Sequence, residues 1–573
     1  MSIAIDARVL PRWRTLVLEE RLALAMAMFA AALLRTMAVF HYRIDSDEPQ
    51  HLHVIWGWTH GLLQYRDLFD NHMPLFQILY APLLRMVGER ADALIAMRLA
   101  VLPLYALMLV LTYHIALACY PRRIAFWSTV VTALFPLLLL GTTEFRTDDL
   151  WTVLWLASIA ILVRGTLTSA RVAAGGFALG MAAAASAKTT LLLLAICVGA
   201  GVVARVSRAG GRGRPPLHIV GIFLAAFAIP PAAIAIYFAA RGAWQPFLYG
   251  VITHNIVQHF RMPRLILFPG LLLLIAILGR RVADSPRRLF LFVTAHFYAA
   301  ALYCLWPLVE HEHWLPYFPL AVITLLPMFF TYRRVMAIVA VEIVLVIVAG
   351  TLWSDNTREG LAIVEQTLQL TTPGESVMDL KGETVFRPRA FFYVLEPLTK
   401  HRIRSGRIGD TIVSDILRAR TMVVAEDHYN FPRLARKFLR RNFISVGAVR
   451  VAGRILRAGE SQFRIDVPAE YAIVGEKNPF AGDIDGQPYD GPKYLAAGTH
   501  TINPPPPDRS YALLWSRAAA LGFKPSGLAN VVRFKRGFYA QGDHSDWRHS
   551  AVCDAGRSHR KTDSQDARSQ SNR

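Results

Sequence analysis

The chain is poor in charge and in cysteine, and it lacks the short motifs of nucleotide-driven enzymes. Only 18% of its residues are charged, and its four cysteines are scattered as Cys119, Cys197, Cys304 and Cys553. That scatter predicts neither a disulfide framework nor a thiolate metal site. The sequence also has no internal repeat, no phosphate-binding glycine loop and no nucleotide fingerprint. An active transporter driven by ATP is therefore unsupported.

Long apolar runs dominate the first 353 residues. Hydrophobic residues make up 54% of the chain, and runs of roughly 17 to 25 residues are long enough to cross a bilayer. We predict about eleven transmembrane helices, at residues 20–41, 95–118, 124–142, 149–164, 172–187, 189–205, 217–239, 265–280, 288–307, 314–331 and 335–353. Pro74–Val87 is too short for a crossing and predicts an interfacial or re-entrant helix. No cleavable signal is evident, so the first run is expected to remain as a span.

Basic residues mark alternate loops, and short loops rich in Arg and Lys remain in the cytoplasm. On one face lie Arg8, Arg12, Arg14, Arg122, Arg123, Arg164, Arg171, Arg205, Arg208, Arg212, Arg214, Arg280, Arg281, Arg287, Arg288, Arg333 and Arg334. The opposite, outer face then receives three acidic segments, Asp45–Glu48, Glu144–Asp149 and Glu310–His313. Charged residues at the edge of the hydrocarbon persist mainly where they line a polar cavity. We therefore expect these three segments to share one site.

The pattern changes after Trp353, where hydropathy falls. Residues 354–540 predict an extracytoplasmic soluble domain of the α/β or α+β class. Strands are expected at Thr421–Ala425 and Tyr471–Val474, and a basic amphipathic helix at Phe431–Arg441. Pro504–Pro507 predicts a stiff extended connector, and the polar tail 541–573 is predicted to be disordered.

The net charge of +21 has two interpretations. Nucleic-acid binding is disfavoured, because the Arg residues of the membrane turns are already explained by topology and no nucleic-acid motif accompanies them. The helix at Phe431–Arg441 either rests on anionic lipid headgroups or presents an ordinary solvated basic face. The sequence leaves both open.

The loop after the first apolar run carries a family resemblance. It contains Asp45-Ser46-Asp47-Glu48, continues through Tyr65–Asn71, and enters a short apolar helix at His72-Met73-Pro74-Leu75. This order resembles the GT-C membrane glycosyltransferases over roughly residues 20–330. The nearest relatives are the bacterial group that includes protein O-mannosyltransferases, the lipid A aminoarabinose transferase and lipopolysaccharide-core sugar transferases. Glu144–Asp149 is similar to the second acidic motif of that family. The sequence departs from the pattern at Met73-Pro74-Leu75, where many relatives have a Lys-Pro-Pro type sequence, so the phosphate-binding role of that lysine is unassigned here.

The resemblance implies transfer of a sugar from a polyprenyl-phosphate carrier, with Asp47 as the general base in an inverting displacement. Glu48 would support Asp47 or contact the acceptor. A carboxylate between apolar walls is expected to have a raised pKa, which would suit this role. The alternative is that Asp45, Asp47 and Glu48 only cap a helix that starts near Pro49.

Several other side chains are candidates for binding the donor phosphate or the acceptor. Arg146 could hold the phosphate through paired hydrogen bonds while Asp148 positions it. Lys188 and His72 are further candidates for phosphate contacts. The alternatives are helix capping by Asp148 with a local ion pair, and a lysine that only snorkels at a helix junction.

Glu310-His311-Glu312-His313 superficially resembles a metal cluster. His311 and His313 are two positions apart and would not face the same side of a helix, so a metalloprotease motif is excluded. In an extended loop the two would share a face, which leaves metal binding open beside a role in lining the sugar or phosphate site. Asp148, Asp149 and Glu312 are the carboxylates open to a divalent metal, and no cofactor is certain.

The sequence thus predicts a polytopic bacterial inner-membrane glycosyltransferase of GT-C type, with a first outer loop at 42–94. Its expected partners are a polyprenyl-phosphate-linked sugar, a glycan, lipid or protein acceptor, and membrane lipid. The main alternative is a transporter or flippase of lipid-linked sugars. A transporter would require polar residues along the cytoplasmic halves of the helices as well. Those halves are apolar here, which favours the enzyme.

Overall fold

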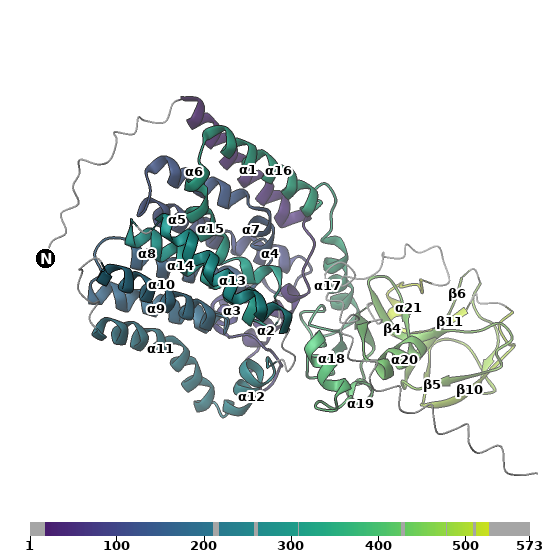
Figure 1. Cartoon of the computed structure of the whole chain (residues 1–573). Helices are drawn as coiled ribbons and strands as arrows, with labels where there is room; N and C mark the ends of the chain where they lie inside the picture. The colour runs from purple at the N-terminus through teal and green to yellow at the C-terminus, as the bar shows by residue number, and fades with distance from the viewer. Residues whose placement is uncertain are drawn as a thin grey trace, which may run out of the picture.

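The computed structural model describes residues 18–209, 217–256, 262–282, 284–307, 309–425, 430–476, 478–507 and 511–526. Figure 1 shows a large helical body followed by a smaller part that mixes helices with strands. The helical body contains α1 (Leu18–His41), α2 (Asp47–Thr59), α3 (Leu75–Val87), α4 (Ala93–Ala100), α5 (Leu102–Leu117), α6 (Arg122–Leu134), α7 (Pro136–Gly141), α8 (Thr147–Val163), α9 (Ser169–Ala185), α10 (Thr189–Ala209), α11 (Leu217–Ala240), α12 (Trp244–Leu248), η1 (Tyr249–Thr253), α13 (Met262–Gly279), η2 (Arg280–Val282), α14 (Pro286–Leu305), η3 (His311–Trp314), α15 (Tyr317–Leu325), η4 (Leu326–Phe329) and α16 (Tyr332–Gly350).

Six segments in the described part of the chain are long and apolar enough to cross a membrane. They are Leu18–His41, Ala93–Leu117, Thr189–Arg208, His218–Ala240, Arg264–Val282 and Pro286–Leu305. The chain is therefore a multi-pass membrane protein. The predicted count of eleven spans is not confirmed, although a helical segment lies at each predicted position. The run at 124–142 is divided at Phe135-Pro136 into α6 and α7, because proline cannot continue a helix without losing a hydrogen bond. Leu75–Val87, Ser169–Ala185 and Tyr317–Phe329 are apolar but shorter.

Close helix packing in the body depends on small residues. Gly176 and Gly180 of α9 lie one turn apart, and a Cβ on either would come within 2.3 Å of a backbone carbonyl oxygen of α11, at Phe223 or Phe227. Without a hydrophobic driving force inside the bilayer, such close backbone approach supplies much of the packing between helices. The two glycines therefore fix the distance between α9 and α11.

The C-terminal part begins at α17 and forms two sheets. Its helices are α17 (Arg358–Leu370), α18 (Pro397–Arg404), α19 (Ile412–Arg418), α20 (Arg433–Asn442) and α21 (Ser516–Ala520). Its strands are β1 (Val377–Met378), β2 (Val423–Ala425), β3 (Phe443–Ser445), β4 (Val449–Ile455), β5 (Gln462–Ile465), β6 (Ala469–Gly475), β7 (Asp483–Ile484), β8 (Gln487–Pro488), β9 (Lys493–Leu495), β10 (Gly498–Asn503) and β11 (Tyr511–Trp515). The larger sheet has the order β1-β2-β4-β11-β6-β9, with β3 also paired to β4, and the smaller has the order β5-β10-β7-β8.

The predicted elements of this part are present. β2 and β6 fall on the two predicted strands, and α20 falls on the predicted basic helix. β1 and β2 are parallel, whereas the other paired strands are antiparallel. α20 buries Ala435 and Leu439 in the core of this part. The two residues are four positions apart and therefore lie on the same face of the helix. The tail at 541–573 lies outside the described residues.

Candidate active site at the acidic loops

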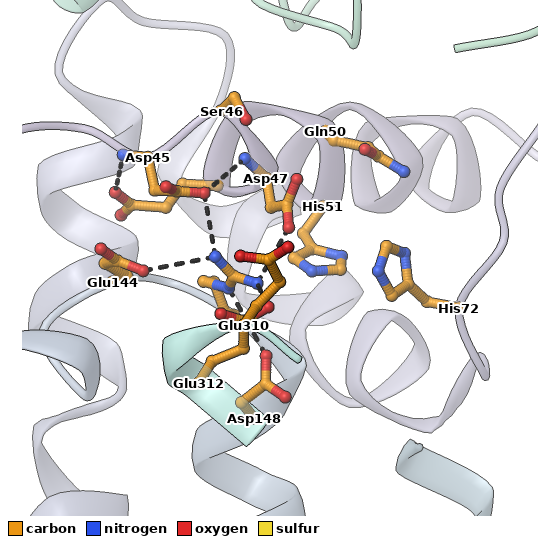
Figure 2. Close-up of polar contacts among 12 residues, drawn as sticks. Asp45, Ser46, Asp47, Gln50, His51, His72, Glu144, Asp148, Glu310 and Glu312 are labelled. Carbon is orange, nitrogen blue, oxygen red and sulfur yellow. Dashed lines mark hydrogen bonds and ion pairs between the residues drawn. The ribbon is translucent and has the colours of Figure 1, made fainter. Parts of the chain in front are cut away.

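The three acidic segments meet around one guanidinium group, that of Arg146. Figure 2 shows the side chains of Asp45, Asp47, Glu144, Asp148 and Glu312 gathered at this point. The nitrogens of Arg146 lie 2.9 Å from Asp45 Oδ1, 2.9 Å from Asp47 Oδ2 and 2.9 Å from Glu312 Oε1. Glu144 and Asp148 each lie 3.4 Å away. The predicted convergence of the three segments is therefore confirmed, while the chemical roles of their side chains remain predictions.

The ends of two helices position this cluster. α2 begins at Asp47 and α8 begins at Thr147, and neither N-cap residue, Ser46 or Arg146, makes a side-chain capping bond. Asp45 does accept a hydrogen bond from the backbone N–H of Asp47 at 3.0 Å. Asp148 instead contacts Lys188 at 2.9 Å. Capping thus accounts for part of the role of Asp45 and for none of the contacts of Asp148.

Glu48 takes part in a buried ion pair with Arg98, and its carboxylate also accepts a hydrogen bond from the backbone N–H of Asp45 at 2.8 Å. Its carboxylate accepts hydrogen bonds from Arg98 at 2.7 and 2.5 Å and from the backbone N–H of Phe145 at 2.8 Å. Both side chains of the pair are fully buried. Arg98 also donates to the carbonyl oxygens of Tyr42 and Arg43. These contacts tie the start of α2 to α4 and to the loop before α8, so Glu48 has a visible structural function.

Asp47 lies between two cations from distant parts of the chain. Its Oδ2 lies 2.9 Å from Arg146, and its Oδ1 accepts a hydrogen bond from Lys381 Nζ at 2.7 Å. Burial alone would raise the pKa of Asp47, but the charges of Lys381 and Arg146 outweigh it and hold the pKa well below its ordinary value. The expectation of a raised pKa was therefore wrong. The expectation considered burial alone and included neither of the two cations.

Lys381 comes from a structured loop of the C-terminal part. Glu383 accepts hydrogen bonds from the backbone N–H groups of Leu380 and Lys381 at 3.0 and 2.9 Å. Gly382 lies against α2, where an added Cβ would come within 2.9 Å of His53 Cβ. His53 Nδ1 lies 2.7 Å from the carbonyl oxygen of Val385. The loop is thus fixed both by its own carboxylate and by α2, and it directs Lys381 at Asp47.

His72 lies beside the cluster without touching Arg146. Its Nδ1 is 2.8 Å from Asp70 Oδ1, and its ring meets that of His51 edge-on at 4.5 Å between centroids. Burial opposes protonation of His72, but the charge and hydrogen bond of Asp70 raise its pKa. Burial lowers the pKa of His51 to about 3. Nε2 of His51 is buried and has no hydrogen-bond partner in the described part of the chain. Figure 2 shows His51 between Asp47 and His72.

The Glu310–His313 segment forms a short 3-10 turn at the lower edge of the cluster. Glu310 and His313 cap this turn reciprocally, which gives His313 a structural role, and burial lowers the pKa of His313 to about 4. His311 Nε2 lies 3.9 Å from Glu144. Burial opposes its charge, but Glu144 raises the pKa of His311 to about 9. At neutral pH the segment therefore contributes one cation, His311.

The residues open to a divalent metal are divided between different partners. Asp148 and Glu312 both face Arg146, whereas Asp149 interacts electrostatically with Arg35 and its two buried oxygens find no hydrogen-bond partner among the described residues. Across those residues, no group of three or more His, Cys, Asp or Glu side chains has the arrangement of a metal site. The geometry does not favour a metal at Asp148, Asp149 and Glu312.

The chain, whose acidic loops meet at one site, has a fold similar to that of solved GT-C membrane glycosyltransferases. Comparison with solved structures supports this assignment. ArnT from Cupriavidus metallidurans in the apo state matches with a TM-score of 0.51 and 12% identity, over 75% of this chain and 97% of that chain. The same protein bound to undecaprenyl phosphate matches with a TM-score of 0.50 and 13% identity, over the same shares.

A weaker match is the Archaeoglobus fulgidus oligosaccharyltransferase tethered with an acceptor peptide, with a TM-score of 0.45 and 9% identity, over 72% of this chain and 69% of that chain. No family model matches the chain, and no curated protein matches it in sequence. The resemblance to GT-C glycosyltransferases is therefore confirmed as a likeness of fold.

Proposed function

We propose that the chain transfers a sugar from a polyprenyl-phosphate carrier to an acceptor on the outer side of a bacterial inner membrane. The observation that carries the proposal is the convergence of Asp47 and Arg146 at the acidic loops of a GT-C fold. A carboxylate that can take a proton and cations that can hold a phosphate are the two requirements of such a transfer. The ArnT structure with bound undecaprenyl phosphate supports a carrier of this class.

In the proposed reaction the acceptor hydroxyl attacks the anomeric carbon with inversion. The new bond joins the acceptor oxygen to that carbon, and the bond from carbon to the phosphate oxygen breaks. Its electron pair leaves with the phosphate, which gains one negative charge, and the acceptor proton passes to Asp47. Arg146 and Lys188, together with protonated His311, supply positive charge near the departing phosphate, and His72, whose pKa is raised by Asp70, lies beside them.

The low pKa of Asp47 is consistent with this role once the donor is bound. A phosphate that engages the cations now paired with Asp47 would reduce their hold on its charge, so the carboxylate would become a stronger base as the substrate arrives. Glu48 is already occupied by Arg98, and we assign it support of the loop and not proton transfer.

The test is transfer of radiolabelled sugar from a panel of polyprenyl-phosphate sugars to membrane extracts by the purified full-length protein. Asp47→Asn should lower the turnover by about a hundredfold or more, whereas Asp92→Asn, at an exposed carboxylate paired with Arg90, should leave it unchanged. Equal turnover of wild type and Asp47→Asn would remove Asp47 from the mechanism. An absence of turnover with every donor would contradict transferase activity and favour a flippase.

A further inference from the structure

Met73, just before the short helix α3, is buried and carries no charge that could bind an anion. Lys381, in the loop that follows β1, places its ammonium group 2.7 Å from Oδ1 of Asp47. We infer that Lys381 is a donor-phosphate ligand, so that the C-terminal domain completes the active site of the membrane domain. This inference rests on the proposed function and assigns a residue to it that the sequence did not reveal.

Among the described residues, the contacts of Lys381 leave one of its N–H donors for a phosphate. An ammonium group has three N–H donors, and within the described residues Lys381 uses two of them, on Ser46 Oγ at 2.9 Å and on Asp47 Oδ1 at 2.7 Å. One of these acceptors is a neutral hydroxyl. Asp47 is therefore the one carboxylate in ion-pair contact with Lys381 in the described structure.

Arg146 differs from Lys381 in this respect. Five carboxylates lie within 3.4 Å of its guanidinium. An incoming phosphate would have to displace several of them to reach Arg146. Lys381 instead carries its charge on a flexible four-carbon stem, and a small rotation would move its ammonium from Asp47 to a phosphate while Ser46 remains within reach. The same movement would free Asp47 to accept the proton of the acceptor.

The loop around Lys381 is built to hold this position. Asp379 accepts hydrogen bonds from Gly382 N at 3.0 Å and from Thr384 Oγ1 at 2.6 Å, and pairs with Arg389 at 2.6 Å. These bonds are additional to those that Glu383 makes to the loop backbone. A backbone fixed in this way presents Lys381 to the site in advance, as expected of a preorganised binding residue.

The experiment measures binding of undecaprenyl phosphate to the purified full-length protein, with undecaprenol as the ligand that lacks the phosphate. Lys381→Gln should weaken the affinity for undecaprenyl phosphate by about tenfold or more, because one charge-assisted hydrogen bond is lost, and should leave undecaprenol binding unchanged. Lys381→Arg should retain most of the affinity. Lys493→Gln is the matched control, because Lys493 also donates to two oxygens, the carbonyls of Gln487 and Pro488, but lies in β9.

A double variant keeps the test valid if Lys381→Gln alone does not fold. Lys381→Gln with Asp47→Asn removes both charges of the ion pair. Neither substitution then leaves the charge of the other residue unpaired. Asp47→Asn alone should bind undecaprenyl phosphate at least as tightly as the wild type, and the double variant should lose that affinity by about tenfold or more.

Three results would overturn the inference. Equal affinity of wild type and Lys381→Gln for undecaprenyl phosphate would do so while leaving the proposed function intact, as would equal affinity of Asp47→Asn and the double variant. A wild type that binds undecaprenyl phosphate no better than undecaprenol would overturn the inference and the proposed function together.

Discussion

The ammonium of Lys381 lies 2.7 Å from Oδ1 of Asp47, although 334 positions separate the two residues in the chain. The contact joins the C-terminal part to the start of α2. Asp47 thus has a cation at each carboxylate oxygen, because Arg146 lies 2.9 Å from Oδ2. The electrostatic state of the candidate base therefore depends on both parts of the protein.

Arg146→Gln is expected to destabilise the folded protein strongly. The substitution would remove the cation that now lies 2.9 Å from each of Asp45, Asp47 and Glu312, of which Glu312 is buried and the two aspartates are half-buried. Removing one partner of a buried charge cluster typically costs about 3–5 kcal/mol. Thermal unfolding in detergent checks this, with Arg418→Gln as the control because Arg418 is an exposed arginine paired with Asp415. Similar unfolding temperatures for the two variants would contradict the prediction.

Glu48→Gln should lower stability and not abolish proton transfer directly. The variant would leave Arg98 fully buried without its carboxylate, at a cost of about 3–5 kcal/mol. Unfolding temperature and turnover at a temperature where the variant is folded should be measured side by side. If the variant were as stable as the wild type but inactive, Glu48 would instead take part directly in the transfer reaction.

His311 should make the stability of the protein depend on pH. Its pKa is raised from 6.5 to about 9, so the charged form is favoured in the folded state. The stabilisation is fully present below pH 6.5 and is lost as the pH rises through about 9. The difference in unfolding temperature between wild type and His311→Gln should therefore shrink over this interval. Parallel curves across it would show that folding does not raise the pKa of His311.

Gly382→Ala should displace the loop that carries Lys381. Gly382 has a φ of +114°, and an added Cβ would come within 2.9 Å of His53 Cβ. Gly374→Ala is a matched control, because Gly374 also has a positive φ, +88°, but open space at the Cβ position. Both variants carry backbone strain, and Gly382→Ala alone should also reduce turnover and undecaprenyl phosphate binding. Equal effects of the two substitutions would mean that the contact with His53 does not matter.

Much of the architecture was predictable because apolar periodicity and loop charge act locally. The helical segments, the strands at β2 and β6 and the meeting of the acidic segments all followed from such patterns. The number of spans did not follow, because several apolar runs form helices shorter than a crossing needs, and one run is divided at Pro136. That signal was present in the sequence.

The partners of the site residues were harder to foresee. Arg98 stands inside an apolar run, and a buried arginine there should have suggested a carboxylate partner such as Glu48. Lys381 gave no such signal, because it lies in a polar loop where a lysine is ordinary. Its role becomes visible only when the fold brings that loop to Asp47, and the pKa of Asp47 could not be judged without it.

The distance along the chain between Asp47 and Lys381 also has a consequence for biosynthesis. Lys381 leaves the ribosome 334 residues after Asp47, an interval of about 17 to 67 s at roughly 5–20 residues per second. During that time the helices around the acidic loops can enter the membrane while the site still lacks one of its cations. A newly made chain would thus gain the contribution of Lys381 to donor binding only when synthesis is well advanced.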